Sequence, residues 1–116
     1  MWTWKDNAEV GEGHRLEHAG EADFAEKVLQ SEAPVLVDFY ADWCGPCRAL
    51  APRLEELARE MPEAKIVKVN VDDSPELAAR FRVSAIPTLA VFRGGRVAAQ
   101  HLGLASKQQL RAMLGG

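Results

Sequence analysis

Hydrophobic positions along the chain follow two periods, which alternate from one segment to the next. A nearly continuous apolar, β-branched run at residues 33–41 predicts a strand covered on both faces, and a β-rich run at residues 64–73 predicts another strand. Residues 87–103 predict a hairpin of two strands that turns at a pair of adjacent glycines. Residues 14–18 are short and mixed in character, which is compatible with an edge strand.

Four other segments place apolar residues three or four positions apart, which predicts helices at residues 21–30, 44–61, 74–83 and 106–114. Ser74 and Ser106 are the expected N-caps of the last two helices. Pro52 should kink the second helix because it removes a backbone donor. The alternation of strands with helices predicts an α/β layer fold with a central mixed sheet.

Composition narrows the class of protein further. A chain of 116 residues with 47% hydrophobic and 27% charged residues fits one globular domain. Residues 1–13 are polar and aperiodic and predict a loosely ordered extension, so the domain is expected to span 14–116. The net charge of −3 argues against nucleic-acid binding. No apolar run reaches the roughly 20 residues of a membrane span, and the start lacks secretory-signal character, so we expect a cytoplasmic protein.

The chain contains two cysteines, Cys44 and Cys47, and three roles are open to them. A structural cross-link over so short a loop contributes only about 2 kcal/mol in the chain-entropy model. A closed zinc site needs four ligands, and the remaining candidates are His14, His18 and His101. The first two histidines have a zinc-finger gap but precede the cysteines, which reverses the order of a finger.

The third role is thiol–disulfide exchange, which the position of the pair favours. Cys44 falls at the start of a predicted helix, where unpaired amides and the helix dipole stabilise a thiolate. Cys47 follows one turn later on the same face, within reach of a mixed disulfide on Cys44. Pro46 fits the first turn without loss of a hydrogen bond.

Several separated motifs carry a family resemblance. The sequence WCGPC at 43–47 is preceded by VLVDFYAD and followed by IPT at 86–88 and FRGGRVAAQHLG at 92–103. From about residue 14 to the end, the chain resembles the thioredoxin family. The resemblance implies a thioredoxin fold, with a central mixed sheet of about five strands flanked by about four helices.

The same resemblance implies a protein disulfide reductase, and we expect the protein to be a monomer. Its redox group would be the Cys44–Cys47 disulfide, with no bound cofactor and no metal. A thioredoxin reductase would restore the dithiol using NADPH, and disulfide-containing proteins would be the substrates. Gly45 and Pro46 between the cysteines resemble the reducing members of the family, whereas oxidising members usually carry a histidine there.

Asp38 interrupts the apolar strand before the cysteines. If both faces of that strand are covered, its carboxyl is buried and suited to proton transfer with Cys47; the alternative is a hydrogen-bonded structural aspartate. The resemblance assigns it the proton-transfer role. Lys68 alone would be a lysine with a solvated amine, but the resemblance places it near Asp38, where it tunes the titration. The resemblance also implies a cis peptide bond before Pro87.

An apolar groove for protein segments is expected around the cysteines. Trp43 is either a packed loop anchor or, as the resemblance implies, a lid on this groove. The expected neighbours are Val71, Ala85, Ile86, Leu102 and Gly103, the last of which would allow a backbone to approach closely. Tyr40 stands where many bacterial thioredoxins have a second tryptophan.

The sequence leaves two other functions open. An oxidase or isomerase would use the same cysteine pair in the other direction. A redox-controlled binding module would hold a partner through the groove around Trp43 without turnover.

Overall fold

The computed structural model describes residues 16–115, which form a mixed five-stranded sheet with strand order β1-β3-β2-β4-β5. The strands are β1 (Leu16–His18), β2 (Val35–Tyr40), β3 (Lys65–Asn70), β4 (Thr88–Arg93) and β5 (Arg96–Leu102). The helices are η1 (Ala25–Leu29), α1 (Gly45–Glu60), α2 (Pro75–Arg80) and α3 (Lys107–Met113). The predicted extension, residues 1–13, lies outside the described residues.

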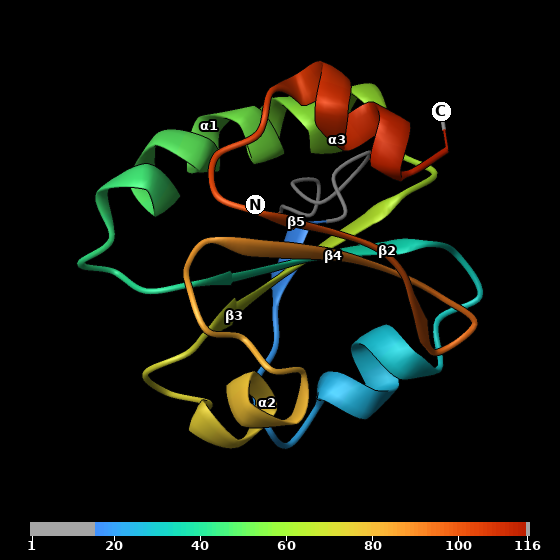
Figure 1. The fold of residues 1–116 in the computed structure, drawn as a ribbon. Coiled ribbons are helices and arrows are strands. Elements are labelled where there is room, and N and C mark those ends of the chain that lie inside the picture. Colours follow the sequence, from blue (N-terminus) through green and yellow to red (C-terminus); the bar gives the residue numbers. More distant parts are fainter. Residues whose placement is uncertain (1–15, 116) are drawn as a thin grey trace, which may run out of the picture.

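Helices cover both faces of the sheet (Figure 1), and a cluster of buried hydrophobic side chains lies on each face. Helices α1 and α3 cover one face, whereas α2 and η1 cover the other. Strand β2 lies at the centre, parallel to β3 and antiparallel to β4. Its first five residues are fully buried because both faces are covered, as the continuous apolar run predicts. The predicted α/β fold with a central mixed sheet is confirmed.

The first predicted helix is shorter than expected. Residues 21–23 form a turn in which the Gly20 backbone amide donates to the Asp23 carboxylate at 2.8 Å. The following segment, Ala25–Leu29, is a π-type turn in which the Gln30 amide donates to the Ala25 carbonyl. The apolar spacing identified the side chains that reach the core but not the hydrogen-bonding pattern of the backbone.

The predicted helix ends are confirmed in part. Ser106 forms a capping box with Gln109 at the start of α3. Ser74 occupies the N-cap position of α2, but its side chain makes no capping hydrogen bond. Pro52 lies inside α1. Within residues 16–115, no helix is both long and apolar enough to cross a membrane.

One edge of the sheet collects the predicted functional residues. Strands β2 and β3 are parallel, so their carboxyl ends meet at the same edge, where α1 begins. Strand β4 runs in the opposite direction and begins there, and β5 ends there, with Thr88 opposite Leu102. Four chain segments that are distant in sequence therefore surround the two cysteines.

Candidate active site

The two cysteines form a disulfide at the start of α1. Cys44 is the N-cap of the helix and Cys47 is its third residue, with 5.2 Å between their Cα atoms. Both are largely buried, with exposed fractions of 4% and 3%. Because each sulfur is bonded to the other, the pair is the oxidised form of a dithiol.

The start of α1 directs a backbone hydrogen-bond donor at the sulfur of Cys44. The backbone amide of Cys47 donates to Cys44 Sγ at 3.2 Å. The Arg48 guanidinium donates to the Asp42 carbonyl at 2.9 Å and ties the preceding loop to the helix. Gly45 and Pro46 are exposed in the first turn, where proline removes no intrahelical hydrogen bond. A thiolate on Cys44 would thus meet an amide and the positive end of the helix.

The loop before β4 lies against the disulfide. The Ile86–Pro87 peptide bond is cis, as the resemblance implied. Cys44 Sγ lies 3.8 Å from the carbonyl oxygen of Ile86. The Gly103 amide donates to the Pro87 carbonyl at 2.8 Å, and Gly103 has a φ of 90°, a conformation that glycine adopts without strain.

Asp38 is fully buried on β2, the strand that precedes the cysteines. Among the described residues, neither of its carboxyl oxygens has a hydrogen-bond partner. Burial raises the pKa of Asp38 from 3.8 to about 7, although the positive charge of Lys68 acts in the opposite direction. Lys68 is the direct cross-strand neighbour of Asp38 on β3. Asp38 is therefore a carboxyl that can gain or lose a proton near neutral pH.

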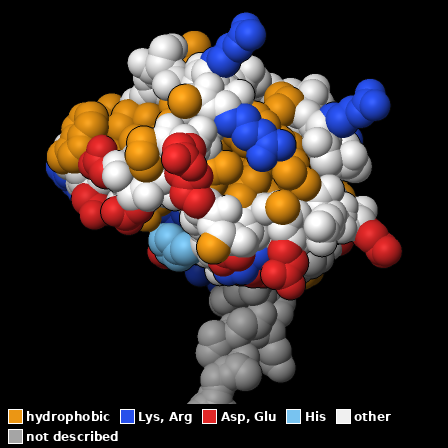
Figure 2. Space-filling model, turned by 90° about the horizontal axis from the view of Figure 1, so that it is seen from below, with side chains coloured by type: hydrophobic (Ala, Val, Ile, Leu, Met, Phe, Trp, Pro, Cys, Tyr) orange, Lys and Arg blue, Asp and Glu red, His pale blue; other side chains and the backbone are white. Residues whose placement is uncertain are grey.

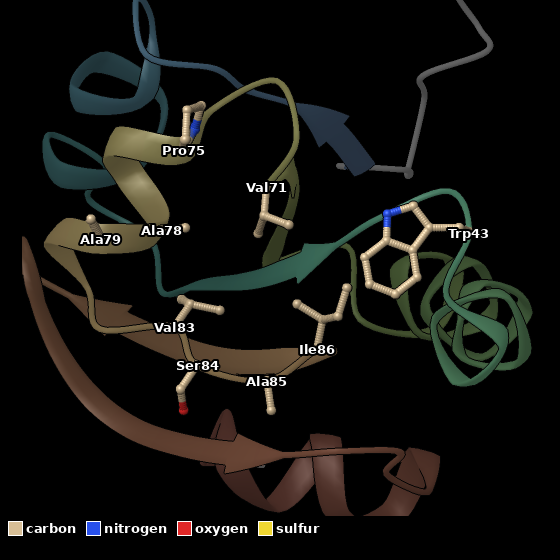
Figure 3. A pocket seen from close by; sticks show the side chains of 9 residues that line it. All are labelled: Trp43, Val71, Pro75, Ala78, Ala79, Val83, Ser84, Ala85 and Ile86. Carbon is tan, nitrogen blue, oxygen red and sulfur yellow. The ribbon is translucent and has the colours of Figure 1, made fainter.

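An apolar pocket of about 420 Å³ lies beside the disulfide (Figure 3). Its lining residues are Trp43, Val71, Pro75, Ala78, Ala79, Val83, Ser84, Ala85 and Ile86. Figure 3 shows Trp43 at one end and α2 at the other, with Val83 and Ile86 directed toward the middle. Seen from the α2 side of the molecule, hydrophobic side chains gather in patches between charged ones (Figure 2).

Trp43 is held over this pocket by a hydrogen bond that the sequence did not reveal. The Trp43 side chain is 68% exposed, and its Nε1 donates to Asp72 Oδ2 at 2.9 Å. Asp72 is itself placed by the loop after β3, where its amide donates to the side chain of Asn70. An exposed indole fixed in this way favours the lid over the packed loop anchor.

Four of the six residues expected in the groove line this pocket, and their contact with substrate stays a prediction. Trp43, Val71, Ala85 and Ile86 line the pocket, but Leu102 and Gly103 do not. Leu102 is 61% exposed at the end of the edge strand β5, where it pairs with Thr88 of β4. The pocket instead extends to α2, whose small Ala78 and Ala79 side chains leave the space open. In the sequence, only the two adjacent alanines of this short helix could have indicated this extension.

An α/β fold that presents a disulfide at a helix start, beside a buried carboxyl and an apolar pocket, defines a thiol–disulfide oxidoreductase. The thioredoxin family profile matches residues 15–115. The thioredoxin of Haemophilus influenzae is 48% identical over 94 residues, which cover 80% of this chain and 88% of that protein. The thioredoxin of Alicyclobacillus acidocaldarius is 47% identical over 90 residues, covering 77% and 86%.

The mitochondrial thioredoxin of Mus musculus is 43% identical over 93 residues, which cover 79% of this chain and 56% of that protein. This chain belongs to the thioredoxin family. It is a protein-disulfide oxidoreductase whose redox-active group is the Cys44–Cys47 disulfide and whose substrates are disulfide-containing proteins. The alternative of a binding module without turnover is not favoured, because the chain keeps both cysteines at the helix start.

Proposed function

We propose that this protein is a disulfide reductase in which Cys44 is the nucleophile, Cys47 the resolving thiol and Asp38 the group that handles the proton. These roles are supported by the position of the cysteine pair at the start of α1, directly after strand β2, which carries the fully buried carboxyl of Asp38. Cys44 accepts a backbone hydrogen bond and lies at the helix terminus, and both features favour its thiolate.

The reaction has two steps. The Cys44 thiolate attacks one sulfur of the substrate disulfide, so a mixed disulfide forms and the other substrate sulfur leaves as a thiolate. Cys47 then loses its proton to Asp38, and its sulfur bonds to that of Cys44 while the second substrate sulfur leaves. The substrate gains two electrons, and the cysteine pair is oxidised to the disulfide seen in the structure.

We further propose that a thioredoxin reductase returns the pair to the dithiol with electrons from NADPH. A reductase of this kind works in a compartment in which thiols are kept reduced, so we assign the protein to the cytoplasm. The apolar residues of the chain already form a core on both faces of the sheet, and this supports a monomer.

Insulin reduction tests the direction of the reaction. With NADPH and a thioredoxin reductase, the full chain is expected to reduce insulin disulfides in repeated turnovers, followed as NADPH oxidation. The control is wild-type chain that has been reduced beforehand and is supplied without the reductase; it should reduce one equivalent of insulin disulfide and oxidise no NADPH. A lack of turnover, or a reduction potential as high as about −120 mV, would indicate an oxidase and contradict the reductase.

We propose that the pocket under Trp43 receives an apolar side chain of the substrate next to its disulfide. Most of the pocket lining is aliphatic, and two of its residues adjoin Cys44: Trp43 precedes it in the chain, and the Ile86 carbonyl lies 3.8 Å from its sulfur. Apolar lining with few polar groups is typical of sites that bind by burial rather than by charge.

The variant Ala79→Glu should weaken substrate binding through this pocket. Ala79 is an exposed pocket residue on α2, so a glutamate there puts a charge where an apolar group should be buried. We expect KM for insulin to rise about tenfold with little change in kcat, since the cost is about 1.4 kcal/mol of binding. The matched control is Ala98→Glu, which adds the same charge at an exposed position of β5. Equal KM values for the two variants would remove the pocket from substrate binding.

A further inference from the structure

We infer that Tyr40 is a positioning residue of this site: the face of its ring holds the ammonium group of Lys68 near the buried carboxyl of Asp38. The inference rests on the proposed function, because it concerns the group that takes the proton from Cys47. It also concerns a position at which this chain departs from the tryptophan of many bacterial thioredoxins.

The three side chains lie on the same face of the sheet. Asp38 and Lys68 are paired directly across the parallel strands β2 and β3. Tyr40 follows Asp38 by two residues and therefore lies on the same face, one step closer to the cysteines. Nζ of Lys68 lies 4.4 Å from the centroid of the Tyr40 ring. This distance is within the range of about 6 Å over which a ring attracts a cation.

Tyr40 and Lys68 also separate two hollows in the surface. One hollow, of about 320 Å³, has Cys47 in its lining, and the other, of about 270 Å³, has His18. Both hollows are lined by Tyr40 and Lys68 together, whereas neither is lined by Asp38. Tyr40 and Lys68 therefore form a wall that the two openings share.

Titratable and charged groups approach this wall from each neighbouring element. The His18 ring stands edge-on to Tyr40, with 6.3 Å between the centroids. Burial raises the pKa of Tyr40, and the nearby carboxylates add to this, so its ring remains uncharged. These groups are His18 on β1, Asp23 before η1, Asp42 after β2, Asp73 after β3, and Cys47 and Arg48 on α1. On β4, the residue opposite Asp38 is the uncharged Leu89.

A cation held at this place favours the ionised form of Asp38. In the resolving step, the Asp38 carboxylate takes the proton of the Cys47 thiol, and the Cys47 sulfur bonds to Cys44. The bond between Cys44 and the substrate sulfur breaks, and the substrate sulfur leaves with the electron pair and takes a proton from water. Without the ring, the Lys68 amine would extend into solvent, and Asp38 would keep its proton to a higher pH.

The test is the variant Tyr40→Leu in the full chain, which removes the ring and keeps an apolar side chain. We expect the titration midpoint of the Asp38 carboxyl, followed by carbon-13 NMR in the oxidised protein, to rise by about one pH unit. The resolving step at pH 7 should then slow about fivefold, because less of Asp38 is ionised. Tyr40→Phe and Tyr40→Trp keep a ring and should keep the wild-type midpoint.

A second pair of variants tests the link between ring and cation. Lys68→Met leaves the ring in place and should raise the Asp38 midpoint as much as Tyr40→Leu does. The double variant should show no further rise, because both changes remove the same interaction. An Asp38 midpoint that stays unchanged or falls in Tyr40→Leu would mean that the ring only excludes water, and this result would overturn the inference.

The same experiments separate this inference from the proposed role of Asp38. The NMR midpoint reports on Tyr40 and Lys68 whether or not Asp38 takes part in turnover. If Asp38→Asn resolves mixed disulfides at the wild-type rate, the proton-transfer role of Asp38 is wrong. A midpoint that rises in Tyr40→Leu would still establish that the ring positions the cation.

Discussion

Replacing Cys44 by serine is expected to abolish disulfide reduction, with insulin turnover falling at least about 1,000-fold. A serine hydroxyl is not ionised near neutral pH, so the amide and helix terminus that face position 44 would have no thiolate to stabilise. Turnover is measured by NADPH oxidation with a thioredoxin reductase. The fold should persist, because the disulfide closes only a short loop and the two large core clusters do not include the cysteines.

The matched variant Cys47→Ser should behave differently. Cys44 is still present and can attack, but no second thiol resolves the product, so a mixed disulfide with the substrate should accumulate. Mass spectrometry of the trapped complex should locate the bond at Cys44. If Cys44→Ser instead traps substrate on Cys47 while Cys47→Ser traps none, the two cysteines have the opposite roles.

The local pattern of the sequence was sufficient to predict the elements that carry the site. Strand β2 is a continuous apolar run with one acidic residue, and α1 has a clear apolar stripe, so both their existence and the burial of Asp38 could be predicted. The start of α1 could also be placed, because glycine and proline follow Cys44. These features depend on neighbours within a few residues.

The remaining geometry depends on contacts between distant segments. The pairing of Asp38 with Lys68 needs the register of β2 against β3, which no local pattern specifies. The hydrogen bond from Trp43 to Asp72 joins two loops separated by 29 residues. The extension of the pocket toward α2 follows from how that short helix packs. Family resemblance placed Lys68 near Asp38, but it did not indicate Asp72 or the ring contact of Tyr40.

The buried carboxyl of Asp38 should make the stability of the fold depend on pH. Below about pH 4, Asp38 is protonated in both the folded and the unfolded chain, so it does not affect the free energy of unfolding. Between pH 3.8 and about 7, the unfolded chain releases this proton while the folded chain keeps it, which favours unfolding. Above about pH 7 both states are ionised, and the loss of stability levels off.

Between pH 4 and pH 8, the free energy of unfolding of the wild type should therefore fall by an amount on the order of 4 kcal/mol because of Asp38. The variant Asp38→Asn should not show this fall. Asparagine has nearly the same shape and stays neutral, so the variant should match the wild type near pH 4 and exceed it at pH 8. Urea denaturation of the oxidised proteins across this range measures the difference. Glu55→Gln, which removes an exposed carboxylate from α1, should retain the wild-type pH dependence.

Parallel stability curves for Asp38→Asn and the wild type would contradict the elevated pKa of Asp38. The same variant connects stability with function, since the proposed mechanism uses the carboxylate that destabilises the fold. Asp38→Asn should hence be more stable at pH 8 yet resolve mixed disulfides more slowly, because Cys47 loses its proton acceptor. A gain in stability without any change in the resolving rate would make Asp38 a structural residue, and the proton would then pass to solvent directly.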